Sequence, residues 1–172
     1  PAALENYGKA FAILDSMPAA KRDLATLHTR FATALAMSGK LSEAIENFQT
    51  SHSILNELIA QNPDDRDLKR DWGKNSVLLG DALEEDLKLD EALETQRTAY
   101  AVLQPLVTEN DTDSQRAAMS AFARIGDVLF KLGKYREALE IQKKSLESDE
   151  KTLAGRRWPG TSRVHLDCIR RR

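Results

Sequence analysis

The sequence of 172 residues predicts an all-α fold, an α-solenoid of antiparallel helix pairs with about three full repeats and a half-repeat at each end. A heptapeptide of one pattern recurs as Lys40–Glu46, Lys88–Glu94 and Lys134–Glu140, so that its central alanines stand 48 and then 46 residues apart. Between the copies, apolar residues recur at spacings of three and four, which is the period of an α-helix. Hydrophobic residues make up 41% of the chain and charged residues 30%, as suits a helical protein with a large surface.

The first unit is predicted to span residues 19–62. Its first helix ends at Gly39, because glycine readily adopts the left-handed conformation that closes helices. A second helix begins near Leu41 and ends before Pro63, since proline disfavours helical geometry in the residue that precedes it.

The second unit, residues 63–109, repeats this plan with helices from about residue 65 to 86 and from about residue 90 to 109. Pro105 interrupts the latter helix. A proline inside a helix removes a hydrogen bond and clashes with the preceding turn, so we expect a kink or an early stop there.

The third unit, residues 110–155, has a first helix that ends at Gly133. Residues 1–18 match the second helix of a preceding half-repeat, and residues 156–172 form a basic tail or the start of a further repeat. An array cut within a unit at both ends exposes apolar faces that a capping repeat would cover. This predicts a longer parent protein or self-association through the terminal half-repeats.

Each unit resembles the tetratricopeptide repeat, a helix-turn-helix motif with bulky and small residues at fixed slots. The slots are filled in unit three by Phe122, Ile125, Gly126, Leu129, Gly133, Tyr135 and Ala138, in unit two by Leu79, Gly80, Leu83 and Ala92, and in unit one by Phe31, Ala32, Leu35 and Ala44. The resemblance covers about residues 1–155 and implies a right-handed superhelix. Small residues in the first helices are expected to face the alanine of the heptapeptide, which lets the two helices of a unit cross closely. These pairs are Ala32 with Ala44, Gly80 with Ala92, and Gly126 with Ala138.

The repeat length departs from the usual pattern. A tetratricopeptide unit commonly has 34 residues, whereas this chain uses 46 to 48, so both helices of a unit are expected to be longer than usual. Stretched units of this kind resemble those of kinesin light chains and of arrays in bacterial signalling proteins. The phrases Ala60–Pro63 and Leu79–Asp81 are similar to the bacterial arrays.

Composition argues against several classes of function. The net charge of −2 gives no overall field that favours nucleic acid or an anionic membrane, and no apolar run approaches the roughly 20 residues that span a bilayer. The single cysteine, Cys168, excludes an intramolecular disulfide and suits a reducing compartment. We therefore predict a cytoplasmic protein without nucleic-acid or membrane partners.

Residues that could carry chemistry have structural explanations. His28 and His52 occupy packing positions far apart in the repeats, and neither they nor His165 has the spacing of a metal site. Cys168 lacks a paired histidine, and no glycine-rich phosphate loop is present. The arginine-rich end is either an anion-binding tail or a solvated terminus, and we favour the latter. We predict no enzyme activity, no catalytic residue, no metal and no cofactor.

The resemblance places the ligand groove on the concave face, which the first helices of successive units line. The residues expected there are Thr26, Thr29, Thr33 and Met37 in unit one, Lys74, Val77, Asp81, Glu84 and Glu85 in unit two, and Ser120, Arg124, Asp127, Phe130 and Lys131 in unit three. Val77, Met37 and Phe130 are the expected apolar anchors, with charges that set the register. The carboxylate clamp of chaperone-binding members is rejected, because only Arg124 matches its pattern.

Three acidic residues in this set allow two readings. Asp81, Glu84 and Asp127 would form an acidic stripe, which favours a ligand with basic residues. The alternative is local pairing, because Asp127 lies three residues after Arg124 and four before Lys131 on one helix. The sequence leaves both readings open.

The predicted function is that of a non-catalytic protein–protein interaction module, a scaffold or adaptor that binds a peptide or protein segment in its concave groove. The alternative is a structural spacer or homo-oligomerisation element of a larger signalling protein. The two differ in the surface they use, which is the groove in the first case and the terminal half-repeats in the second.

Overall fold

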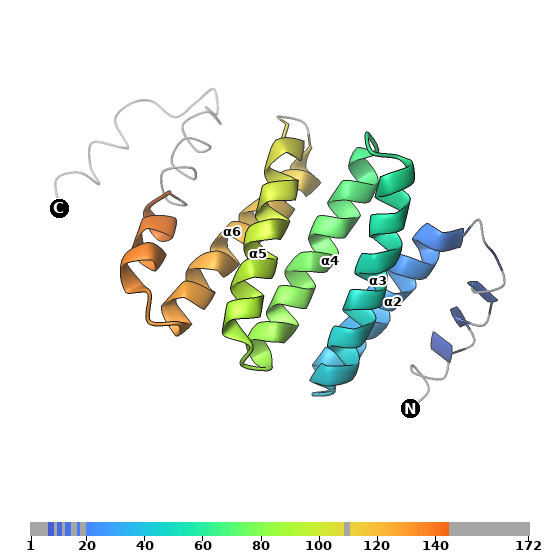
Figure 1. Ribbon diagram of the computed structural model, residues 1–172, viewed down its shortest axis with the longest axis horizontal. Coiled ribbons are helices and arrows are strands. Elements are labelled where there is room, and N and C mark those ends of the chain that lie inside the picture. The colour runs from blue at the N-terminus through green and yellow to red at the C-terminus, as the bar shows by residue number, and fades with distance from the viewer. Residues whose placement is uncertain are drawn as a thin grey trace, which may run out of the picture.

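The computed structural model describes residues 20–108 and 111–144, together with residues 7–8, 10–11, 13–14 and 17. Every regular element among them is a helix, so the predicted all-α fold is confirmed (Figure 1). The bounds are Lys21–Met37 for α2, Leu41–Gln61 for α3, Arg66–Glu85 for α4, Leu89–Leu103 for α5, Gln104–Leu106 for a 3-10 turn and Thr112–Lys131 for α6. Residues 135–144 are helical as well.

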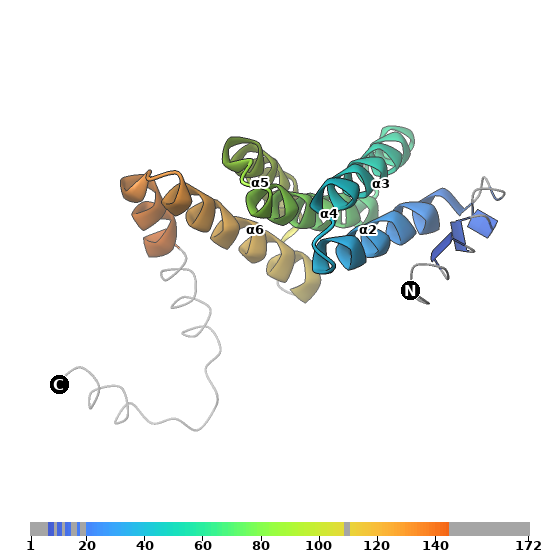
Figure 2. The same cartoon turned by 90° about the horizontal axis from the view of Figure 1, so that it is seen from below.

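The helices pack as successive antiparallel pairs. α2 lies against α3 and α4 lies against α5, while α6 packs on α5 and is followed by the helical segment 135–144. The first helices α2, α4 and α6 form one layer, and α3 and α5 lie on its other side (Figure 2). We call the free side of the layer formed by α2, α4 and α6 the first-helix face, and the opposite side the outer face.

Each of the helices α2 to α6 lies within one of the predicted units. α2 and α3 fall within residues 19–62, α4 and α5 within residues 63–109, and α6 within residues 110–155. The assignment of each pair to one repeat stays a prediction. The expectations for residues 156–172, which include His165 and Cys168, lie outside the described residues, as does the predicted helix beyond residue 144.

The helices are long for a helix-turn-helix repeat. α3 has 21 residues, and α4 and α6 have 20 each. At a rise of 1.5 Å per residue, each of these helices extends about 30 Å. The helices of the described residues nevertheless lack a stretch long and apolar enough to cross a membrane.

The turn within each pair has the same hydrogen bonds. Gly39 and Gly133 have φ of 75° and 73°, and Leu87 takes the equivalent position with φ of 62°. In each turn the following lysine donates its N–H to a carbonyl five residues earlier: Lys40 to Leu35 at 3.0 Å, Lys88 to Leu83 at 2.9 Å and Lys134 to Leu129 at 2.9 Å. This is the Schellman arrangement, in which one residue adopts the left-handed conformation. The predicted helix ends at Gly39 and Gly133 are confirmed.

The junctions between pairs follow local rules as well. α5 ends at Leu103 and the chain continues as a 3-10 turn containing Pro105, so the predicted early stop is confirmed. The Asp65 carboxylate accepts hydrogen bonds from the N–H groups of Asp67 and Leu68 at 2.9 and 3.0 Å, which caps α4. Asp111 caps α6 in the same way by accepting from the Ser114 N–H at 2.9 Å.

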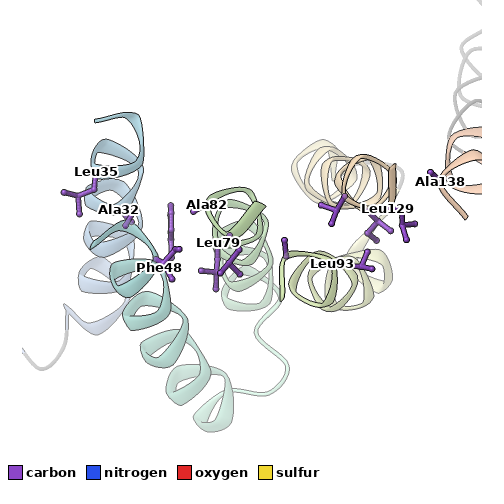
Figure 3. Close-up of a cluster of buried hydrophobic side chains, with 14 residues drawn as sticks. Ala32, Leu35, Phe48, Leu79, Ala82, Leu93, Leu129 and Ala138 are labelled. Atoms are coloured by element: carbon purple, nitrogen blue, oxygen red, sulfur yellow. The ribbon is translucent and has the colours of Figure 1, made fainter. Parts of the chain in front are cut away.

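The largest core cluster runs through all the described pairs (Figure 3). It is built from one face of each helix, and its members include Ala32, Leu35, Phe48, Leu79, Ala82, Leu93, Leu129 and Ala138. Each pair therefore buries its apolar face against the next pair as well as within itself, as expected for a solenoid.

The small residues of the first helices do allow close crossing, but the partners of the glycines differ from the prediction. A Cβ atom on Gly80 would lie 2.4 Å from Nε2 of Gln96, and one on Gly126 would lie 3.2 Å from Cγ2 of Ile141. The nearest neighbours are thus Gln96 and Ile141, further along the second helix than the expected alanines. A long side chain of the second helix therefore covers each glycine.

Candidate functional site

The predicted groove residues of units two and three lie where α4 and α6 pack together. Four ion pairs connect the two helices, and we call them the charge ladder. They are Arg70 with Asp111 at 3.4 Å, Lys74 with Asp113 at 3.9 Å, Asp81 with Arg124 at 3.0 Å, and Glu84 with Lys131 at 2.6 Å. The basic members of α4 come first along the helix and the acidic members come last, and α6 has the complementary order.

The ladder corrects the expectation of an acidic stripe. Asp81 and Glu84 are each paired with a cation of the neighbouring helix. The predicted local pairing within α6 is confirmed for Arg124 and Asp127, whose closest charged atoms are 3.9 Å apart. The surface therefore alternates in charge instead of presenting one sign, because Asp81 and Glu84 of α4 reach across to cations of α6.

Asp81 is the member of the ladder whose pKa is raised. Burial raises the pKa of Asp81 to about 6, and the nearby carboxylates of Glu84 and Asp127 act in the same direction. Arg124 and a hydrogen bond from Gln96 Nε2 at 3.2 Å oppose this rise in pKa without cancelling it. The Asp81 carboxylate therefore begins to take up a proton at a pH just below neutral. Protonation removes the negative partner of the ion pair with Arg124.

Glu84 is the most buried acid of the ladder, since its side chain is 11% exposed. Its contact with Lys131 at 2.6 Å supplies the counter-charge that a buried carboxylate requires. The pairs formed by Lys74 and Arg124, in contrast, have more exposed acids, since the side chains of Asp113 and Asp81 are 55% and 30% exposed.

Two predicted groove threonines have structural partners instead. Thr29 Oγ1 lies 2.8 Å from Ser51 Oγ and 2.9 Å from Asn75 Oδ1, so it belongs to a polar cluster that joins α2, α3 and α4. The Thr33 hydroxyl donates to the Thr29 carbonyl oxygen at 2.9 Å. Asn75 also donates to the Phe48 carbonyl oxygen at 2.9 Å. This cluster was not predictable from the sequence, because the exposure of a polar residue on a helix depends on the neighbouring helices.

The predicted apolar anchors divide into two kinds. Val77 is 7% exposed and packs in a core cluster with Leu103 and Ala121, so its predicted role as an anchor is wrong. Met37 and Phe130 are 86% and 62% exposed and are available to a partner.

Met37 and Phe130 belong to a larger exposed apolar edge. The turns within the pairs lie along one edge of the array, which is the lower edge in Figure 1. Leu87 and Tyr135 are exposed at these turns too, and the ring centroids of Phe130 and Tyr135 are 5.3 Å apart. We call Met37, Leu87, Phe130 and Tyr135 the turn edge. A sequence signal for Leu87 existed, because it stands where the two other units have glycine.

The outer face carries two pockets that are equivalent by repeat. The α4 pocket, of about 330 Å³, lies between α3 and α5 and is lined by Gln49, His52, Trp72, Ser76, Leu79, Leu83, Glu91, Glu94, Thr95 and Thr98. The α6 pocket, of about 460 Å³, is lined by Arg97, Tyr100, Phe122, Ile125, Leu129, Arg136, Glu137, Glu140 and Ile141. The lining of the first is about equally polar and apolar, whereas that of the second is mainly apolar. Neither was predicted, because each forms only where three helices meet.

An aromatic contact recurs between successive pairs near these pockets. The ring centroids of His52 and Trp72 are 4.4 Å apart, and those of Tyr100 and Phe122 are 5.1 Å apart. Burial lowers the pKa of His52. Within the part of the chain that the structure describes, no group of three or more His, Cys, Asp or Glu side chains could hold a metal ion.

Comparison with known proteins shows similarity to a tetratricopeptide repeat in part of the chain and to a solved structure over most of it. Residues 120–152 match the family model described as tetratricopeptide repeat. The structure is similar to the crystal structure of BtubC (BKLC) from P. vanneervenii, with a TM-score of 0.73 and 17% sequence identity. This match covers 92% of the present chain and 59% of BtubC. A search of curated protein sequences found no match.

Proposed function

Because the chain carries a tetratricopeptide repeat on a helical array of that fold, we propose that it is a non-catalytic module that binds a peptide or protein segment. Tetratricopeptide repeats are generally protein-interaction modules and are typically non-catalytic. The proposed binding surface is the first-helix face together with the turn edge, and the proposed location is the cytoplasm.

The observation that carries this proposal is the exposure of Met37 and Phe130 at the turn ends of two first helices. Large apolar side chains in contact with water become favourable anchors once a partner covers them. The charge ladder lies along the same pair of helices α4 and α6, where Asp127 and Lys131 also reach solvent. Apolar anchors would supply most of the binding energy, and the alternating charges would fix the register of the bound segment.

A displayed library of short random peptides tests the proposal directly. Peptides selected on the wild-type protein are expected to bind with a Kd of about 1 μM, measured by fluorescence anisotropy. The double variant Met37→Ser/Phe130→Ser should raise this Kd at least about tenfold, which corresponds to about 1.4 kcal/mol. Val107→Ser removes an exposed apolar residue at the junction between α5 and α6, remote from the turns within the pairs, and serves as the matched control. Selected peptides that bind the double variant as tightly as wild type would contradict the proposed surface.

A second candidate function is self-association through the N-terminal end. Ile13 and Met17 are 61% and 51% exposed there, which gives a second copy an apolar surface to cover. Light scattering over a range of protein concentrations should then show a mass that rises with concentration and falls back to the monomer in Met17→Glu. A constant monomer mass would rule this candidate out.

A further inference from the structure

The last described helical segment, residues 135–144, has one covered side and one open side. Its alanine of the heptapeptide, Ala138, is 4% exposed, so the segment keeps its contact with the core. The next residue behaves differently. Ile45 and Leu93 hold this position in the first two heptapeptides and are 6% and 5% exposed, whereas Leu139 is 52% exposed. The heptapeptide pattern is thus kept while the burial of this leucine is lost.

A second position shows the same difference. Phe48 and Gln96, which lie three residues after Ile45 and Leu93, are 2% and 0% exposed. The equivalent residue of the last segment, Gln142, is exposed. We call the surface that Leu139 and Gln142 form the end surface, and it lies at one end of the described array (Figure 1).

In the first two pairs the cover is the first helix of the next pair. α4 packs on α3 and α6 packs on α5. Both covering helices carry buried apolar residues at positions i, i+3 and i+4, which we call the apolar triplet. The triplets are Leu79, Ala82 and Leu83 in α4, and Ile125, Val128 and Leu129 in α6. Ile45 and Leu93 belong to the same core cluster as the triplets (Figure 3). The array itself therefore shows what kind of helix covers this position.

The described chain has no spare helix of this kind. The triplets of α4 and α6 are buried in their own core, so a second copy does not present them. Residues 145–172 contain no apolar residues at i, i+3 and i+4. The sequence pattern thus favours a cover that comes from another protein.

We propose that the end surface binds an amphipathic helix of a partner protein, in the place that α4 takes on α3 and α6 takes on α5. The partner helix would bring an apolar triplet against Leu139. Covering this leucine removes apolar area from water and continues an interface that the array forms twice. The inference goes beyond the proposed function, because it uses the end surface instead of the first-helix face or the turn edge.

The first arm of the test uses the α6 sequence as a probe. A fluorescent peptide of residues Thr112–Lys131 is held helical by a staple that replaces the exposed Met119 and Ala123, because isolated helices of this length are marginal. Fluorescence anisotropy should show saturable binding to the full chain. The same stapled peptide with serine at the three triplet positions should bind at least about tenfold more weakly. Equal binding of the two peptides, or no binding of the first, would overturn the proposal.

The second arm uses variants of the protein. Leu139→Glu should weaken the stapled peptide at least about tenfold. Leu87→Glu makes the same change at an exposed leucine of another turn and should leave the affinity unchanged. Thermal melts confirm that both variants are folded. A peptide that binds Leu139→Glu as tightly as wild type has another site, such as the place of the chain's own α6, and this result would refute the end surface.

Two other occupants give results of their own. A mass that rises with concentration in wild type but not in Leu139→Glu, measured by light scattering, would assign the end surface to a second copy. A spin label on Cys168, the single cysteine, that broadens the methyl signals of Leu139 would assign it to residues 145–172. Either result would overturn the assignment to a partner helix.

These results separate from those of the peptide selection. The selection depends on Met37 and Phe130 at the turn edge, and the helix test depends on Leu139 at the end surface. Helix binding that depends on Leu139, without selected peptides that depend on the turn edge, would reject only the proposed function's surface. The opposite outcome would reject only the end surface.

Discussion

Arg124 Nε on α6 lies 3.0 Å from Asp81 Oδ1 on α4, and this ion pair of the charge ladder joins the first helices of two successive pairs. Asp81 also accepts a hydrogen bond from Gln96 on α5 at 3.2 Å. The Asp81 carboxylate therefore links α4 to both α5 and α6, at a position where burial disfavours its charged form.

The first prediction concerns the titration of Asp81. Its pKa is raised from 3.8 to about 6 in the folded protein, mainly by burial. The folded state then binds the proton more tightly than the unfolded state, so this group makes the free energy of unfolding fall as pH rises from about 4 to 6. Carboxyl ¹³C NMR should give a titration midpoint near 6 for Asp81. Asp81→Asn should remove this part of the pH dependence, and an Asp81 midpoint near 4 would contradict the assignment.

The second prediction compares two rungs of the charge ladder. Lys131→Met leaves the Glu84 carboxylate, whose side chain is 11% exposed, without its counter-charge, and should lower the free energy of unfolding by about 1–3 kcal/mol. Lys74→Met breaks an exposed contact of 3.9 Å to Asp113 and should cost less than about 1 kcal/mol. Urea unfolding at pH 7 measures both changes. Adding Glu84→Gln to Lys131→Met should recover most of the loss, and no recovery would show that the lysine acts through packing alone.

The third prediction concerns the turn residue Leu87. It holds a φ of 62° where Gly39 and Gly133 stand in the other turns, and it is 81% exposed. The left-handed conformation costs a non-glycine residue about 1–2 kcal/mol, while glycine adds unfolded-state entropy that offsets part of the gain. Leu87→Gly should therefore raise the free energy of unfolding by about 0.5–1 kcal/mol. Gly133→Leu should have the opposite effect, measured in the same urea titration, and equal signs for the two variants would refute the explanation.

The fourth prediction concerns two helical glycines. A Cβ atom on Gly73 would lie 2.5 Å from Cδ2 of the fully buried Leu103, so Gly73→Ala must displace a core side chain and should cost about 1–3 kcal/mol. A Cβ atom on Gly126 would lie 3.2 Å from Ile141, which is only partly buried and can yield. The gain of about 1 kcal/mol in helix propensity should make Gly126→Ala nearly neutral. Thermal melts compare the stability of the two variants. A larger loss of stability in Gly126→Ala than in Gly73→Ala would contradict this explanation.

Features governed by short-range rules were predictable from the sequence. Gly39 and Gly133 close their helices, and Pro105 stops α5 early, because a single residue restricts the local backbone. The threefold heptapeptide likewise indicated the helix pairs, since its spacing matches the length of one pair.

The partners of individual side chains were not predictable in this way. Val77 was expected in the groove and lies in the core, and Asp81 was expected to be open to a ligand and is paired with Arg124. Helical periodicity gives only the approximate direction of a side chain. The packing of α4 against α5 and α6 decides which side chains are buried and which are paired.

The sequence by itself determined the all-α solenoid, the helix ends and the repeat, because these depend on backbone preferences and on apolar spacing within one segment. Only the tertiary structure decided which charges of α4 meet those of α6, and which acids of the outer pockets have a counter-ion. Those contacts join residues about 40 positions apart, as in Arg97 with Glu137. They depend on how one pair is rotated and displaced against the next, and that geometry results from the packing of all the side chains at the boundary.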